Sequence, residues 1–147
     1  MIKPSLVAVE EGAQIVHPVF EHGEAVDAHA EGEALLGWLN ATVQLRAADP
    51  FEAQPVLQQF ATDIQSQLNE ASAEIAHLKM TLSPDSNIGG QVAIINLVRN
   101  DFVPELSADL DGPIESGQLI INLRAEGDPE LLRDTVKNAV ANGPTNL

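Results

Sequence analysis

Residues 38–46 read Trp38-Leu39-Asn40-Ala41-Thr42-Val43-Gln44-Leu45-Arg46, with apolar side chains at positions 39, 41, 43 and 45 and polar ones between them. A period of two places the two sets on opposite faces, which predicts a half-buried β-strand. Asp49-Pro50-Phe51-Glu52 follows and combines a capping aspartate, a proline at the first helical position and an acid three residues after the cap. This pattern predicts that an amphipathic helix begins at Pro50 and continues through Leu68.

Further strands and a second helix are predicted beyond this helix. Alternating or apolar segments, separated by turn-forming residues, predict strands at 74–82, 91–99 and 118–125. Asp128-Pro129-Glu130 repeats the cap-then-proline pattern and predicts a last helix through Val140. Residues 100–116 are expected to be a connector with little regular structure.

This order of elements predicts an α+β fold. We expect a ferredoxin-like two-layer sandwich, in which one mainly antiparallel sheet carries two helices on one face. Residues 37–147 are expected to form this domain, and residues 1–36 an acidic N-terminal extension. Within the extension, residues 5–9 and 14–20 are expected to pair as a hairpin around a turn at 10–13.

Composition limits the classes of partner. The 147 residues contain 7 Lys and Arg against 22 Asp and Glu, a net charge of −15, and no cysteine. A field of this sign repels nucleic acid and anionic membranes, so neither is an expected partner. Without cysteine the chain has no disulfide, thiol nucleophile or thiolate metal site. No apolar run approaches the roughly 18–20 residues of a membrane helix, and we expect a cytoplasmic protein.

The layout of residues 37–141 carries a family resemblance. It consists of a strand, Asp-Pro-Phe at 49–51, a strand with a central Lys79, two more strands, and a helix opened by Gly127-Asp128-Pro-Glu-Leu-Leu. This layout resembles the C-terminal domain of CobW-type metallochaperone GTPases. That family has Arg-x-Lys-Gly in the second strand, where this chain has His77-Leu78-Lys79-Met80, so only Lys79 matches.

The resemblance implies an accessory role. The chain has neither a Gly-x-x-x-x-Gly-Lys-Ser/Thr loop nor the cysteines of the family's Cys-x-Cys-Cys motif, so GTP hydrolysis by that mechanism is not expected. What remains is a non-enzymatic accessory or partner-binding domain, concerned with metal or cofactor handling. The GTPase would then be a separate subunit or another part of a longer chain.

A histidine-rich segment is the candidate metal site. Three of the four histidines lie close together among carboxylates, and the candidate ligands are His17, Glu21, His22, Glu24 and His29. Imidazole with carboxylate suits a divalent transition metal. Their spacing matches no established site, and the alternative is a solvated acidic connector.

The face of the sheet away from the helices is the second candidate site. Strand alternation places six polar or charged residues on it, namely Arg46, His77, Lys79, Asn96, Asn122 and Arg124. The motif Ile-Ile-Asn-Leu occurs at 94–97 and again at 120–123, which puts Asn96 and Asn122 in equivalent positions. Three of the seven cations on one face could bind a carboxylate, a phosphate or an acidic protein surface.

Several interpretations of this face remain open. We expect it to be buried in a homo-oligomer or against a protein partner. The alternatives are a small-anion site, a face covered by the N-terminal segment and a solvated sheet. No serine lies in a nucleophile pattern, and a lone strand histidine such as His77 is more often structural than catalytic. The chain is therefore expected not to be an enzyme, although an enzyme with an unrecognised site stays open.

Overall fold

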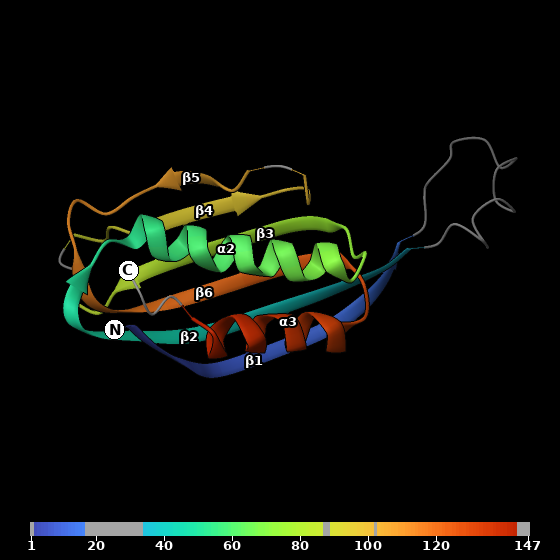
Figure 1. The fold of residues 1–147 in the computed structure, drawn as a ribbon, viewed down its shortest axis with the longest axis horizontal. Helices are drawn as coiled ribbons and strands as arrows, with labels where there is room; N and C mark the ends of the chain where they lie inside the picture. The colour runs from blue at the N-terminus through green and yellow to red at the C-terminus, as the bar shows by residue number, and fades with distance from the viewer. Residues whose placement is uncertain (1, 17–33, 87–88, 102, 144–147) are drawn as a thin grey trace, which may run out of the picture.

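The computed structural model describes residues 2–16, 34–86, 89–101 and 103–143. These residues form one six-stranded antiparallel sheet with two helices on one of its faces (Figure 1). The elements are β1 (Ile2–Val16), β2 (Ala34–Phe51), α2 (Ala53–Glu70), β3 (Ile75–Pro84), β4 (Ala93–Leu97), β5 (Glu105–Ala108), β6 (Ile114–Glu126) and α3 (Pro129–Ala141). The prediction of an α+β fold with one antiparallel sheet and two helices is confirmed.

The strand order is β1-β2-β6-β3-β4-β5. The last strand, β6, is antiparallel to both β2 and β3, so these two run parallel with β6 between them and α2 as their connection. In this split β-α-β arrangement, one helix connects two parallel strands that a third strand separates. Here the second helix, α3, follows the last strand.

The core lies between the sheet and the two helices. Leu39, Ala41, Val43 and Leu45 of β2 are at most 2% exposed, as the alternation of residues 38–46 predicts. From the other layer, the α2 residues at helical spacing are buried, namely Val56, Leu57, Phe60, Ile64 and Leu68. Full burial of such a side chain is worth about 1.5–3 kcal/mol, so these positions dominate the stability of the sandwich.

The start of α2 differs from the prediction. The helix begins at Ala53 with Glu52 as its N-cap, while Asp49 and Pro50 still belong to β2. Phe51 explains the difference, because it is 6% exposed and pairs with Ile114 of β6. Burying a phenylalanine contributes about 1.5–3 kcal/mol, more than the roughly 1 kcal/mol of a good N-cap.

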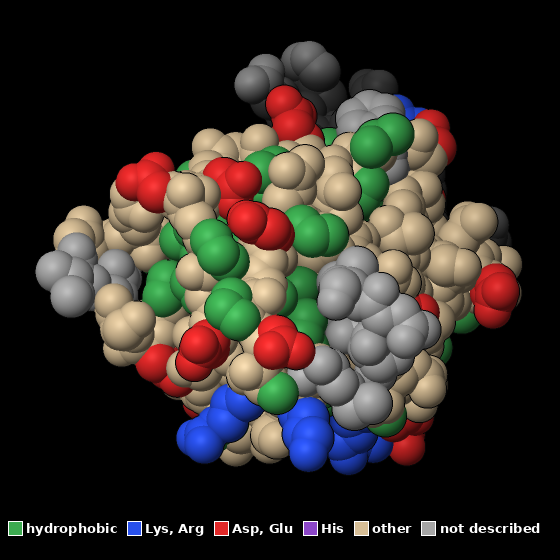
Figure 2. All heavy atoms as spheres, turned by 60° about the vertical axis from the view of Figure 1, so that its left-hand side comes forward, with side chains coloured by type: hydrophobic (Ala, Val, Ile, Leu, Met, Phe, Trp, Pro, Cys, Tyr) green, Lys and Arg blue, Asp and Glu red, His purple; other side chains and the backbone are tan. Residues whose placement is uncertain are grey.

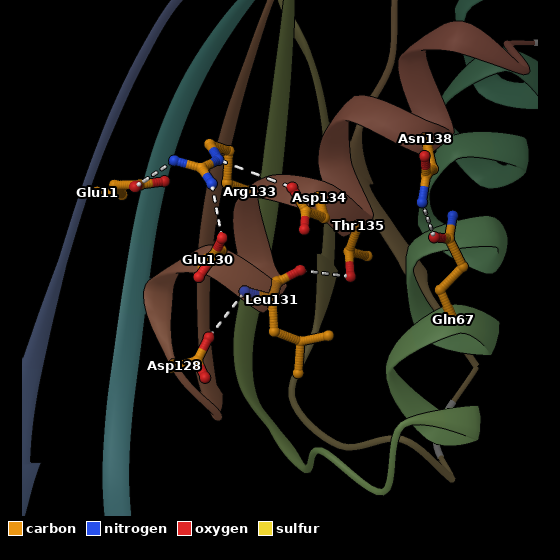
Figure 3. A network of polar contacts seen from close by, with 9 residues as sticks. All are labelled: Glu11, Gln67, Asp128, Glu130, Leu131, Arg133, Asp134, Thr135 and Asn138. Carbon is orange, nitrogen blue, oxygen red and sulfur yellow. Dashed lines mark hydrogen bonds and ion pairs between the residues drawn. The ribbon is translucent and has the colours of Figure 1, made fainter.

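The cap predicted for α3 does form. Asp128 Oδ1 accepts a hydrogen bond from the Leu131 amide at 2.9 Å, and Pro129 is the first residue of the helix (Figure 3). Asn138 of α3 donates to Gln67 of α2 at 3.4 Å and links the two helices. Gly127 and Asp128 take part in none of the strand pairings that the structure describes, so the local signal decides where α3 starts.

Two predictions about the N-terminal and connecting segments are wrong. No hairpin forms within residues 5–16, because β1 is a single strand that pairs with β2 from Ile2 to Val16, with one irregularity between Leu6 and Ala8. Pairing along the whole edge of β2 satisfies more backbone groups than a short local turn would. The connector at 100–116 contains β5, which pairs with β4, and the first residues of β6.

Within the described part of the chain, neither helix combines the length and apolar character needed to cross a bilayer.

Candidate functional site

The sheet face opposite the helices, called here the open face, carries a row of polar side chains. Cross-strand partners share a face, and the register aligns one residue from each strand. From β1 to β5, this polar row consists of Glu10, Asn40, Asn122, Lys79, Asn96 and Glu105. Lys79 stands in the middle of the row, with an asparagine on each neighbouring strand. The repeated Ile-Ile-Asn-Leu motif therefore supplies both neighbours of one lysine.

Hydrogen bonds hold the asparagines of this row. Asn122 Nδ2 donates to Asn40 Oδ1 at 2.8 Å. On the other side of Lys79, Asn96 Nδ2 donates to Ser107 Oγ at 3.1 Å. Its remaining amide atom, Oδ1, lies 3.2 Å from His77 Nε2. An amide oxygen can only accept a hydrogen bond, so His77 Nε2 is the donor in this contact. The other ring nitrogen, Nδ1, takes no part in it.

A second row lies beside the polar row. Arg124 of β6 is paired with His77 of β3 on one side and with Trp38 of β2 on the other. Trp38 in turn pairs with Gly12 of β1. A Cβ atom at Gly12 would clash with the indole ring, so the absence of a side chain there is what lets Trp38 lie against β1.

The two rows enclose a hollow of about 240 Å³ on the open face. Its lining residues come from the three adjacent strands β2, β6 and β3: Trp38, Asn40, His77, Lys79, Asn122, Leu123 and Arg124. All of the ionisable residues in this lining are basic. Lys79 and His77 are half-buried and Arg124 is exposed.

The cations of the hollow have no partner among the residues that the structure describes. The described ion pairs involve Arg99 and Arg133, and no described side chain bonds to Lys79 or Arg124. A lysine ammonium offers three donors and an arginine guanidinium five. The hollow therefore presents positive charge and unused N–H groups, an arrangement that can bind an oxyanion.

The structure brings five of the six predicted open-face residues together. Four of them line the hollow, namely His77, Lys79, Asn122 and Arg124. The fifth, Asn96, contacts His77 through its side-chain oxygen. Arg46 does not join them, because it stands six residues along β2 from Asn40, about 20 Å away at the rise of a strand.

Arg46 instead pairs across the strands with Lys3 of β1 and Ser116 of β6. Figure 2 looks toward this end of the molecule, where basic side chains gather at the lower edge and acidic ones are scattered over the rest of the view. Arg46 thus lies beside Lys3 on the open face, apart from the hollow.

Sequence reasoning missed Trp38 and Asn40 as parts of the site. Both lie an even number of residues before Arg46 in the same strand, so the alternation of residues 38–46 places them on the same face as Arg46. That pattern alone would have added them to the candidate residues. Their closeness to Lys79 and Arg124 depends on β6 pairing with β2, which no local pattern indicates.

The predicted metal ligands His17, Glu21, His22, Glu24 and His29 lie outside the described residues. Within the described ranges, no group of three or more His, Cys, Asp or Glu side chains could hold a metal ion. The chain matches no protein-family model, no curated protein and no solved structure.

Proposed function

We propose that this chain is a non-enzymatic partner-binding domain that presents its open face to an acidic surface of another protein. The observation that carries the proposal is the pair of cations Lys79 and Arg124, which have no partner among the described residues of a chain with a net charge of −15. A partner's carboxylates would supply the charge-assisted hydrogen bonds that these cations lack.

Apolar residues next to the hollow support a protein partner. The register places Thr42, Ile120, Thr81 and Ile94 in a row directly beside the polar row. Ile120 is 38% exposed, and Val98, directly after the end of β4, is 47% exposed. A patch that combines exposed aliphatic side chains with a few strong donors has the composition of a protein interface.

Charge favours an acidic partner over a second copy of this chain. In a two-fold symmetric contact the same patch meets itself, so Lys79 and Arg124 of both copies would approach one another. Like charges brought together across an interface cost several kcal/mol. A partner with carboxylates facing the hollow avoids this cost.

The proposal includes the role that the family resemblance implies, an accessory to metal or cofactor handling with a separate GTPase as a candidate partner. It also includes a cytoplasmic location. Ferredoxin-like character is proposed for the split β-α-β unit formed by β2, α2, β3 and β6.

The test compares two variants with equal changes of charge. Lys79→Glu with Arg124→Glu alters the hollow, whereas Arg99→Glu with Lys137→Glu alters two exposed cations outside the hollow. The immobilised chain is used to retain binding proteins from an extract of its native cells, and each retained protein is then purified and its affinity measured by calorimetry. We expect the hollow variant to weaken binding at least about ten-fold and the control variant to bind as the wild type does.

Equal effects of the two variants on the measured affinity would contradict the proposal, since they would indicate non-specific charge attraction. Sedimentation velocity at low micromolar concentration tests the occupant. We expect a monomer. A wild-type dimer that the hollow variant dissociates would instead identify a second copy as the partner.

A further inference from the structure

We infer that the hollow lined by Trp38, Lys79 and Arg124 is a binding site for one compact oxyanion, a carboxylate or phosphate group. This inference deepens the proposed function, because the same hollow would receive an acidic group of the partner. It also makes a separate claim, that the hollow binds such a group when it is offered as a free small anion.

The charge of the lining is the first argument. Among the residues that the structure describes, no acid lines the hollow, while three basic or imidazole side chains do. The polar row places its two acids, Glu10 and Glu105, on the outer strands β1 and β5 at the two ends of the row. Positive potential is therefore concentrated over the central strands.

The supply of hydrogen-bond donors is the second argument. Asn40 accepts from Asn122 through Oδ1, which leaves its own amide hydrogens without a partner among the described residues. Lys79 and Arg124 add their unpaired donors on the neighbouring strands. Binding an oxyanion in water requires several N–H donors, at least one of them on a charged group, and no carboxylate that competes for them.

The walls of the hollow are held in place, which is the third argument. Its strands β2, β6 and β3 are adjacent in the sheet, and Leu123, between Asn122 and Arg124 on β6, is 1% exposed and anchors this part of β6 in the core. Gly12 accommodates the Trp38 ring, and the Asn96 contact holds His77. A site whose donors are already positioned loses less side-chain entropy on binding.

The size of the hollow defines the class of ligand. About 240 Å³ is less than the roughly 300–1,000 Å³ of sites for drug-sized molecules. Phosphate or a short dicarboxylate fits this space, whereas a nucleotide would extend beyond it.

Trp38 provides the readout, because it lines the hollow and is the single tryptophan of the chain. The purified chain is titrated with inorganic phosphate and, separately, with succinate at constant ionic strength, and potassium chloride serves as the control salt. We expect a saturable change in Trp38 fluorescence with at least one of the two anions, and a matching one-to-one heat in calorimetry. Which anion saturates identifies the phosphate or the carboxylate as the source.

Single neutral variants test the residues. Arg124→Gln and Lys79→Gln should each raise the dissociation constant about ten-fold or more, because each removes a charged donor. Lys137→Gln on α3 changes the charge equally and should leave the constant unchanged. Arg124 is exposed, so its variant keeps the test valid even if the half-buried Lys79 variant folds poorly.

The inference is overturned if neither anion gives a fluorescence change or heat beyond the chloride control at concentrations up to about 10 mM. That is about ten times a dissociation constant of 1 mM. Equal weakening by Lys137→Gln would also overturn it. Failure here with retained partner binding would remove the anion site and leave the proposed function standing. If the anions bind but no protein partner is weakened by the hollow variant, the anion site stands and the proposed function is removed.

Discussion

Arg133 of α3 donates a hydrogen bond through Nη1 to Glu11 Oε1 of β1 at 3.1 Å, across 122 residues of sequence (Figure 3). Glu130 and Asp134 lie 3.4 and 3.7 Å from the same guanidinium, so one cation serves three acids. Glu11 Oε2 and Arg133 Nε are buried without a hydrogen bond. The distance of 3.7 Å from Nε to Asp134 Oδ1 is too long for one. This contact joins the N-terminal strand to the C-terminal helix.

Removing Arg133 should destabilise the fold. Arg133→Met would leave three carboxylates near one another, with Glu11 only 28% exposed. Because both partners are about one-third exposed, solvent screening reduces the effect, and we expect a loss of about 1–2 kcal/mol in the free energy of unfolding. Urea denaturation measures it. Glu130→Gln is the control, since Glu130 is 75% exposed and should change stability by less than about 0.5 kcal/mol. An Arg133 variant as stable as wild type would show that the contact contributes nothing.

A side chain at Gly12 should displace Trp38. Gly12→Val puts atoms where the indole ring lies, and overpacking of this kind costs about 1–3 kcal/mol. The emission of Trp38 should shift as the ring moves into solvent, and thermal denaturation should occur at a lower temperature. Gly112→Ala is the matched control, because a Cβ there meets no atom within 4 Å. An unchanged emission spectrum in Gly12→Val would contradict the placement of Trp38.

The two aspartates that precede prolines should differ in their effect on stability. Asp128→Ala removes the bond to the Leu131 amide and should cost about 1 kcal/mol. Asp49→Ala should change the free energy of unfolding by less than about 0.5 kcal/mol, because α2 begins after Glu52 and Asp49 caps no helix. Equal losses in chemical denaturation would mean that Asp49 does cap a helix in solution.

The histidine-rich segment should account for any tight binding of a transition metal. Outside it the chain offers one histidine, His77, and no thiol. Changing His17, His22 and His29 to Ala together should abolish zinc or nickel binding tighter than micromolar, as measured by calorimetry. His77→Ala is the control and should bind as the wild type does. Unchanged affinity in the triple variant would remove the segment from consideration.

Local patterns were sufficient where no other interaction opposed them. The alternation of residues 38–46 and the cap at Asp128 both predicted the observed structure. The same cap-and-proline pattern at Asp49 predicted a helix start that does not form. Phe51 is instead buried in a strand, where it pairs with Ile114, 63 residues later in the sequence. The long β1 strand was missed for a similar reason, since its pairing partner Ala34–Phe51 is distant in sequence and the turn-like residues at 10–13 suggested a local hairpin.

The sequence by itself determined which side chains share the open face, because strand periodicity assigns each residue to one side of the sheet. Tertiary structure decided which of them are neighbours. Asn40, Asn122, Lys79 and Asn96 form one row because β6 lies between β2 and β3 in one register, while Arg46 on the same face stands apart. Strand order and register arise from pairings between distant segments, and a shift of one residue would move every side chain of a strand to the other face. The hollow therefore exists only in the assembled sheet.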